Sequence, residues 1–440
     1  MLPPPLPAPL PVAVSAETRL AYVLRHFWLA YPGGPVVAVG YAGTQPQVEI
    51  AELSGDFFAG SAPYPAAPNW RAWQGQQIPF FFDQPDQPLL VLQENRAVIS
   101  ADIIAAAFYL LSGWQEYFSG ERDRHGRFPY AASVQQQYGF VARPVVNYYF
   151  DVLRAAVAHV SGQPLRPRSW GAQKADFAAF ISHDVDNLRS AWKAPAKAAL
   201  QQRKFGRFGW LLWQHLTQPD AWDNLEAVAA AVAQYGGRST FFILPSHRKA
   251  ANGTPNADYR LTPKLRQRLA QLAAQGCELG LHGSLGTAIN DDQLEADVFE
   301  ANTAFNVRFH YLSWEPRQTI ALLNDAEMKW FAVSYDSTLG FAEHYGFRHS
   351  YCQPFYPFNF AAGREANFLE IPLNVMDTTL HHPKYLQRGL GAVAQREFRP
   401  GQHPKRPAPV PPNNGALAAR RRSLPHRPRH LAGVHCGANS

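Results

Sequence analysis

Strand-like apolar runs alternate with helical patterns through the second half of this 440-residue chain. Apolar residues recur at helical spacing in 221–236, 262–276 and 291–305, and a shorter helix is expected at 318–327. The expected strands lie between these helices, at 178–183, 239–245, 277–283, 307–314, 330–337 and 367–377. Such alternation predicts a parallel sheet or barrel, in which functional groups lie on loops at the carboxyl ends of the strands.

The first 165 residues predict a smaller mixed α/β region. A strand is expected at 35–42 and helices at 101–118 and 143–160. The Gly- and Pro-containing segment 161–173 has the composition of a linker. Two domains are also the default for a chain of this length. We therefore expect an N-terminal mixed α/β domain over 1–165 and a second α/β domain over 174–387.

The positive charge of the chain gathers in its last 53 residues. The formal net charge is +7, but residues 388–440 hold ten Lys or Arg and a single acid, Glu397. The same segment contains eight prolines and one aromatic residue, so it cannot bury enough apolar surface to fold alone. A charge run of this kind is usually solvated, and we expect no nucleic-acid partner.

An out-of-frame origin is one hypothesis for residues 388–440. The chain carries 56 aromatic residues up to Gln387 and one beyond it, with the composition that GC-rich codons give in a wrong frame. A genuine disordered Pro/Arg-rich tail is the alternative. The gene decides between them: another frame after codon 387 should encode a helix and then a leucine-rich strand ending in Leu/Trp-His, whereas early stops in both frames would refute the hypothesis.

Several sequence features predict a cytoplasmic protein without a membrane partner. No run of 18 apolar residues is present, as a spanning helix would need. The N-terminus has six prolines in its first twelve residues and no basic start, unlike a secretory signal. The three cysteines, Cys277, Cys352 and Cys436, match neither a zinc-knuckle spacing nor a disulfide framework.

Charged side chains follow the expected strands at their ends. The stretch "ISHDVDN" (181–187) places His183, Asp184 and Asp186 after an apolar run, and His282 and Asp336 end two later strands. Two acids so close repel, and they need a metal ion, a cationic side chain or a shared proton. Two carboxylates with a histidine suit a divalent metal of zinc, cobalt or manganese type, with one carboxylate left as a general base. Each of these motifs alone more often marks a turn or a residue of the core. It is their occurrence together at successive strand ends that predicts a site.

Five segments resemble, in order, the motifs of the polysaccharide deacetylase superfamily, the NodB-homology group or carbohydrate esterase family four. They are "FISHDVDN" (180–187), "STFFILP" (239–245), "ELGLHGS" (278–284), "RFHYL" (308–312) and "YDSTLGF" (335–341). The resemblance spans about 178 to 380 and is closest to a bacterial subgroup. Segment 112–134 is similar to the uncharacterised domain that precedes such catalytic domains. The resemblance implies a distorted (β/α) barrel that uses a divalent metal to hydrolyse N-acetyl groups of a glycan substrate.

The resemblance also implies roles for individual residues. Asp184 matches the catalytic base, and Arg308 matches the arginine that pairs with this base and keeps it ionised. His282 matches the first metal-binding histidine. The metal-binding aspartate is usually the next residue after the base, so Asp186 is the candidate, reaching past the spacer Val185. Supporting positions are His183, Ser284, His310, Tyr311 and Asp336.

Two departures from the family pattern leave alternatives open. Gly286 stands where a second metal-binding histidine is expected, and the substitutes considered are His183, His247 and His310. The final histidine that protonates the leaving amine is absent, because His381 and His382 come too early in the order. A hydrolase of another amide on the same barrel, or a catalytically impaired sugar-binding protein, are therefore the alternatives. Tight stoichiometric metal would favour an enzyme.

Overall fold

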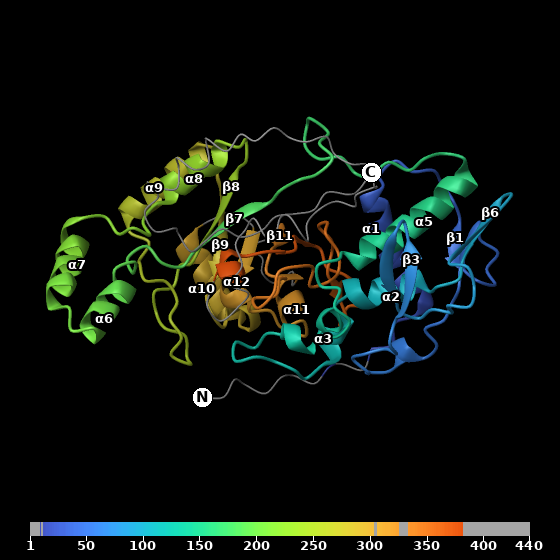
Figure 1. Cartoon of the computed structure of the whole chain (residues 1–440), viewed down its shortest axis with the longest axis horizontal. Coiled ribbons are helices and arrows are strands. Elements are labelled where there is room, and N and C mark those ends of the chain that lie inside the picture. Colours follow the sequence, from blue (N-terminus) through green and yellow to red (C-terminus); the bar gives the residue numbers. More distant parts are fainter. Residues whose placement is uncertain (1–8, 10–11, 303–305, 325–332, 382–440) are drawn as a thin grey trace.

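A computed structural model describes residues 9, 12–302, 306–324 and 333–381 of the chain (Figure 1). Its second half is built on a six-stranded sheet in the order β14-β11-β10-β9-β8-β7, in which every neighbouring pair is parallel. The strands are β7 (Ile181–Val185), β8 (Ser239–Ile243), β9 (Glu278–Gly283), β10 (Asn306–Phe309), β11 (Tyr335–Asp336) and β14 (Leu369–Glu370). Because all six run in one direction, their carboxyl ends meet at one edge.

Helices connect successive strands of this sheet, as the alternating pattern predicts. They are α8 (Leu225–Ala233), α9 (Pro263–Ala274), α10 (Asp291–Ala301) and α11 (Thr319–Asn324), and a short helix α12 (Asp377–His381) follows the last strand, β14. The side chain of Thr262 caps α9 by accepting a hydrogen bond from the Leu265 N–H, and Pro263 opens the helix. Leu265, Leu269 and Leu272 of α9 are buried in one cluster with residues of β8.

The expected barrel is observed only as an open parallel sheet. Strands β7 and β14 are its two edges, and no strand among the described residues joins them. The strands expected at 330–337 and 367–377 are shorter in the structure, and residues 330–332 lie outside the described ranges. The end of the second predicted domain, 382–387, and the tail 388–440 also lie outside them.

The first half contains a four-stranded sheet in the order β1-β2-β6-β5, covered by helices. Only the β5–β6 pair is antiparallel. The strands of this sheet are β1 (Val39–Tyr41), β2 (Val48–Ile50), β5 (Leu90–Gln93) and β6 (Arg96–Ile99), and β3 (Asn69–Trp73) and β4 (Gln76–Phe80) form a separate hairpin. The helices are α1 (Ala16–Ala30), α2 (Ile103–Leu111), α3 (Trp114–Phe118), α4 (Val134–Gln137) and α5 (Val145–Ser161).

The single helix expected at 101–118 is two helices, because the chain turns at Gly113. This glycine has φ 70°, a left-handed conformation that other residues seldom adopt, and a Cβ there would meet the His349 ring at 2.9 Å. The remaining short elements are β12 (Phe358–Asn359), paired with β13 (Arg364–Glu365), and 3-10 turns at Phe57–Ala59, Tyr130–Ala132, Thr287–Ile289 and His310–Leu312.

One continuous apolar core joins the two halves of the chain. Phe358, from the second half, packs its ring edge-on against Phe108 at 4.9 Å and against Tyr22 at 5.2 Å. Trp114 and Phe360 meet in the same cluster, with ring centroids 5.6 Å apart. The first half therefore packs directly on the segment that follows β11, and Figure 1 shows these regions side by side.

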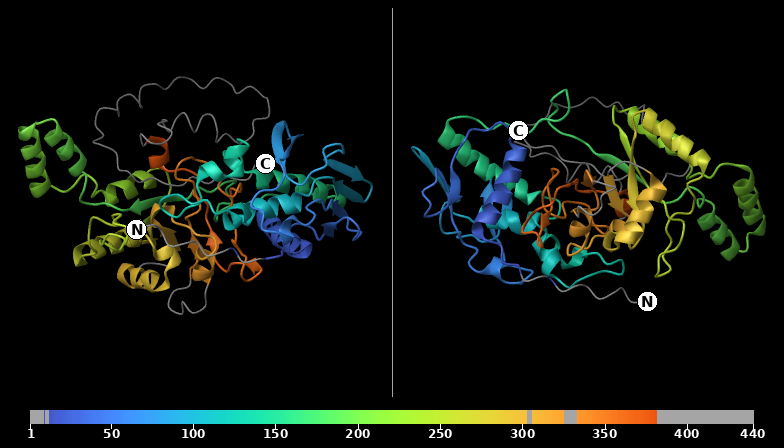
Figure 2. Two further views of the ribbon diagram at one scale, coloured as in Figure 1. Left: turned by 90° about the horizontal axis from the view of Figure 1, so that it is seen from below. Right: turned by 180° about the vertical axis from the view of Figure 1, so that it is seen from behind.

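A helical hairpin between β7 and α8 was not expected from the sequence. Helices α6 (Lys193–Gln201) and α7 (Phe205–Thr217) pack against each other and extend away from the sheet (Figures 1 and 2). None of the helices in the part of the chain that the structure describes is both long and apolar enough to cross a membrane.

A buried ion pair also links the two halves. Arg348 donates two hydrogen bonds to the Glu116 carboxylate, at 2.8 and 2.6 Å, and both side chains are almost fully buried. Burial alone would raise the pKa of Glu116, but Arg348 and His349 outweigh it and lower this pKa to about 2. Glu116 is therefore ionised at neutral pH, and its charge depends on Arg348.

We predict that Arg348→Ala destabilises the protein by about 3–5 kcal/mol, because it leaves the Glu116 charge buried without a partner. Because the pKa of Glu116 is lowered, the stabilisation is complete above about pH 4.5 and lost as pH falls toward 2. Urea unfolding at several pH values measures both effects. The control is Glu300→Ala, which removes an exposed pair with Arg266 and should cost less than about 1 kcal/mol. Equal effects from the two variants would contradict the prediction.

Candidate metal centre

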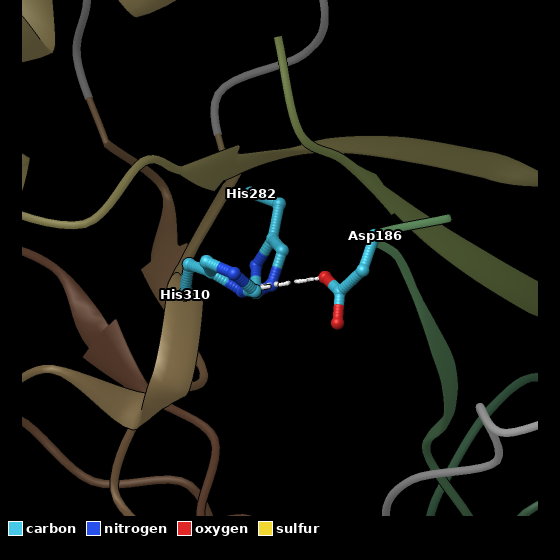
Figure 3. Close-up of side chains that lie close together, drawn as sticks. All are labelled: Asp186, His282 and His310. Atoms are coloured by element: carbon cyan, nitrogen blue, oxygen red, sulfur yellow. Dashed lines mark hydrogen bonds and ion pairs between the residues drawn. The ribbon is translucent and has the colours of Figure 1, made fainter. Parts of the chain in front are cut away.

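Three potential metal ligands converge at the carboxyl edge of the parallel sheet (Figure 3). Asp186 follows β7, His282 lies near the end of β9, and His310 follows β10. Asp186 Oδ1 lies 3.2 Å from His282 Nε2 and 3.3 Å from His310 Nδ1. The two imidazole nitrogens lie 3.2 Å apart. The three elements thus bring one oxygen and two nitrogens to a single point.

The chemistry of these three atoms fits a divalent metal. His282 Nδ1 lies 2.8 Å from the Arg308 carbonyl oxygen, which can only accept, so Nδ1 carries the proton and Nε2 has a free lone pair. Ligands of a tetrahedral zinc ion lie about 3.3 Å from one another, close to the distances seen. Asp186 Oδ1 is buried and makes no well-aligned hydrogen bond to any described residue. Two histidines and one carboxylate leave a further coordination position open.

Neighbouring charges shift the pKa values of both Asp186 and His282. Burial acts to raise the pKa of Asp186, but His310 and His282 outweigh it and hold this pKa well below the ordinary value. Burial likewise acts to lower the pKa of His282, whereas Asp184 and Asp186 raise it overall. A proton on His282 competes with a metal ion for Nε2, so the affinity for metal should fall as the pH is lowered.

Asp184 and Arg308 form an ion pair beside the three ligands. Arg308 is fully buried, and its Nη1 lies 2.9 Å from Asp184 Oδ1. The other nitrogens of Arg308 donate to the carbonyl and hydroxyl oxygens of Ser337, both at 2.8 Å, and its guanidinium lies 4.5 Å from the centre of the Phe242 ring. Burial acts to raise the pKa of Asp184, but Arg308 and His282 lower it overall, so Asp184 is ionised at neutral pH.

Strand alternation explains why Asp184 joins the site and His183 does not. The strand expected to end at His183 continues to Val185, and successive side chains of a strand point to opposite faces. His183 Nε2 contacts the Ser239 hydroxyl at 3.0 Å, and its ring packs on Phe241. Val185 is buried in the apolar cluster between the sheet and α9. His183 therefore lies apart from the ligand cluster.

The structure selects His310 among the substitutes for the missing histidine at 286. Gly286 has φ 106°, so a histidine at this position would be strained. His247 is exposed and lines a neighbouring cavity. His310 is 5% exposed and contacts both other ligands.

The other predicted supporting residues lie around the cluster rather than in it. Ser284 donates its backbone N–H to Asp297 at 2.7 Å. Asp336 accepts hydrogen bonds from the backbone and hydroxyl of Thr338, both at 2.8 Å, and so fixes the turn after β11. Burial raises the pKa of Asp336, and it raises the pKa of its neighbour Glu370 strongly. Asp336 and Glu370 thus hold the turn that follows β11, and Ser337 in this turn binds Arg308.

A turn from the first half of the chain supports His310, and sequence reasoning missed it. Tyr311 and Leu312 have φ of 61° and 55°, which is strained for residues other than glycine. Arg127 donates to the Tyr311 carbonyl oxygen at 2.7 Å, and the His125 ring stacks on Tyr311 at 4.6 Å. Asp123 holds Arg127 in turn, at 2.6 Å. Segment 112–134 had been singled out for its resemblance, but nothing in its pattern pointed to this contact.

A cavity of about 470 Å³ lies beside the end of β7. Asp258, in its wall, donates its backbone N–H to the Asp186 carbonyl oxygen at 3.2 Å. Cationic side chains are frequent in the wall, and none of the three candidate ligands belongs to it. The lining includes Arg189, Lys193, Arg260, Lys264 and Arg268, together with the carboxylates of Asp223 and Asp258. The cavity therefore adjoins the candidate metal centre but is not lined by its ligands.

Comparison with known proteins gives one match. Residues 36–161 match a family described as a family of unknown function (DUF7033). No curated protein and no solved structure matches the chain. The matched segment ends before β7, so it contains none of the three candidate ligands.

We predict that Asp186→Ala, His282→Ala and His310→Ala each weaken metal binding by roughly 10²-fold or more, since even outer-shell substitutions cost about 10–100-fold. Metal per chain, measured after dialysis against zinc or cobalt, tests this. His183→Ala is the matched control, because its ring lies on the opposite face of β7. Full metal content in all three ligand variants would place the site elsewhere.

We also predict that Arg127→Ala weakens metal binding by about 10–100-fold, because the strained turn that places His310 loses its partner. The absorption spectrum of bound cobalt should change as well, and Arg127→Lys should recover part of the affinity. Glu121→Ala, an exposed change in the same segment, is the control. Unchanged affinity and spectrum in Arg127→Ala would show that the contact does not position His310.

Proposed function

We propose that this chain is a metal-dependent hydrolase that removes N-acetyl groups from a carbohydrate. The observation that carries the proposal is the placement of Asp184 beside the cluster of Asp186, His282 and His310. Asp184 Oδ2 lies 4.0 Å from His282 Nε2, so an ionised carboxylate borders the ligand set. The resemblance of five ordered motifs to polysaccharide deacetylases supports the substrate class and a distorted (β/α) barrel, of which the open sheet is the described part.

The reaction needs a Lewis acid, a base and a buried charge that holds the base. A zinc, cobalt or manganese ion held by the three ligands would polarise the amide carbonyl and lower the pKa of a water molecule. Asp184 accepts the proton of the attacking water, whose oxygen bonds to the amide carbon. The carbon–nitrogen bond then breaks, and Asp184 returns the proton to the leaving nitrogen. Acetate and a free amine are the products.

Arg308 sets both the ionisation and the orientation of the Asp184 carboxylate. It keeps the carboxylate ionised, and its three other contacts hold the guanidinium in place. Because Arg308 is fully buried, water cannot replace Asp184 as its partner at low cost. Asp184 is therefore oriented before substrate binds, which reduces the cost of reaching the transition state.

We predict that Asp184→Asn lowers turnover by about 10²–10⁴-fold while metal stays bound, because the amide cannot accept the proton. The assay measures acetate released from N-acetylglucosamine oligomers by the metal-loaded protein. Asp292→Asn, the same chemical change at an exposed position of α10, should leave turnover unchanged. Near-normal turnover in Asp184→Asn would remove this residue from the mechanism.

The same assay separates the proposed enzyme from its alternatives. Acetate release that depends on added metal and on Asp184 supports the proposal. Hydrolysis of simple or cyclic amides without activity on the oligomers would reassign the substrate. Tight binding of the oligomers with no hydrolysis by metal-loaded protein would leave a sugar-binding protein.

A further inference from the structure

The hairpin of α6 and α7 is a small unit held together by its own contacts. Leu211 packs against Ala196 and Ala199 with the help of Phe208, and the rings of Trp192 and His215 stack at 4.5 Å. All three views show the two helices projecting from the body of the molecule (Figures 1 and 2). The inner faces of the two helices are thus packed against each other within the hairpin, and their outer faces remain exposed.

The outer face of α7 is apolar and exposed. Phe205, Leu212, Trp213 and Leu216 follow one another at i, i+7, i+8 and i+11, which places them on one side of the helix. Their exposed fractions are 67%, 36%, 56% and 74%. Trp210, 54% exposed, extends this apolar surface. A contiguous exposed patch of large apolar side chains marks an interaction surface.

The charge around this surface has a single sign. From Arg189 to Pro219 the sequence contains six Lys or Arg and no Asp or Glu. Lys197, Arg203, Lys204 and Arg207 belong to the hairpin itself and are free of ion pairs among the described residues. Any partner of the apolar face must therefore be compatible with several uncompensated positive charges, which selects an anionic one.

We propose that the α6–α7 hairpin binds the surface of an anionic lipid bilayer. Trp, Phe and Leu on one face with Lys and Arg around it is the pattern of a helix that lies in the membrane interface. Tryptophan in particular prefers the headgroup level of a bilayer. At 13 residues, α7 is about 20 Å long, too short to cross the hydrocarbon core and long enough to lie along it.

This inference departs from the expectation of no membrane partner. That expectation rested on the lack of a spanning segment, which has no bearing on a surface helix. Lys193, the first residue of α6, comes seven positions after Asp186. The hairpin thus follows the carboxyl edge of the sheet, where the candidate metal ligands lie. Contact of the hairpin with a bilayer would hold this edge close to the membrane surface. The inference does not depend on the proposed deacetylase activity.

Vesicle sedimentation with the full chain tests the proposal. We expect binding to vesicles of an equimolar mixture of phosphatidylcholine and the anionic lipid phosphatidylglycerol, and much weaker binding to pure phosphatidylcholine. Binding should weaken as salt is raised. Lys197→Gln with Lys204→Gln should reduce partitioning roughly 25-fold, about fivefold for each cation. Phe205→Ser with Leu216→Ser should reduce it more than about tenfold.

Matched controls separate the hairpin from the rest of the chain. Arg248→Gln with Lys249→Gln removes two exposed cations elsewhere, and Phe299→Ser removes an exposed aromatic of α10. Both should bind like the parent protein. Every variant keeps the ten Lys and Arg of residues 388–440, so any contribution of that segment cancels. Circular dichroism and the melting temperature check that each variant is folded.

Two outcomes would overturn the proposal. The first is vesicle binding that shows no preference for anionic lipid, or that the hairpin variants leave unchanged. Either result would assign the affinity to a part of the chain outside the hairpin, such as residues 388–440. The second is a concentration-dependent dimer, seen by light scattering, that Phe205→Ser with Leu216→Ser abolishes while vesicle binding is absent. That result would assign the apolar face of α7 to a second copy of this chain.

Discussion

A buried positive charge organises the carboxyl edge of the sheet. Arg308 has no exposed surface, so its guanidinium must find all its partners within the protein. Those partners come from three strands or their ends: Asp184 in β7, Ser337 after β11 and the Phe242 ring in β8. The carbonyl oxygen of the same residue accepts the hydrogen bond that sets the tautomer of His282. One residue in β10 therefore orients a candidate base and a candidate ligand together.

Arginine side chains also join the first half of the chain to the segment that follows His310. Arg122 binds Glu315 with two hydrogen bonds, at 2.7 and 3.0 Å, and Arg317 donates to the carbonyl oxygen of Tyr117 at 2.7 Å. Glu315 and Arg317 follow the turn at Tyr311 closely along the chain. Bidentate arginine contacts fix both distance and angle, so they restrain a loop more tightly than a single hydrogen bond does. The candidate metal centre is thus built by both halves of the chain.

The sequence predicted those parts of the site that depend on strand ends. Alternation of strands and helices places residues after β7, β9 and β10 at one edge, so the pattern singled out Asp186 and His282 together with Asp184 and Asp336. The resemblance, and not the pattern, proposed Asp186 and His282 as the ligands and Asp184 as the base. Asp184 and Arg308 meet across the sheet because their strands share this edge. His310 was only one of three substitutes, since choosing it required the backbone turn at Tyr311, which no local pattern reveals. The contact from Arg127 joins residues 184 positions apart, and such pairing has no signature in a single sequence. The α6–α7 hairpin was missed because its apolar residues face outward as well as inward.

The common apolar core of the two halves limits how this protein can be divided. Phe355, Phe358 and Phe360 pack in one cluster with side chains of α1, α2 and α3. A fragment that begins after residue 165 would expose these rings to water, and a fragment that ends there would lose the surface that covers Tyr22 and Phe108. The segment that matches DUF7033 is therefore not an independent module that recombination could move between proteins at no cost. Gene fusion or exchange would have to carry the segment around β12 along with it, or rebuild the facing surface residue by residue.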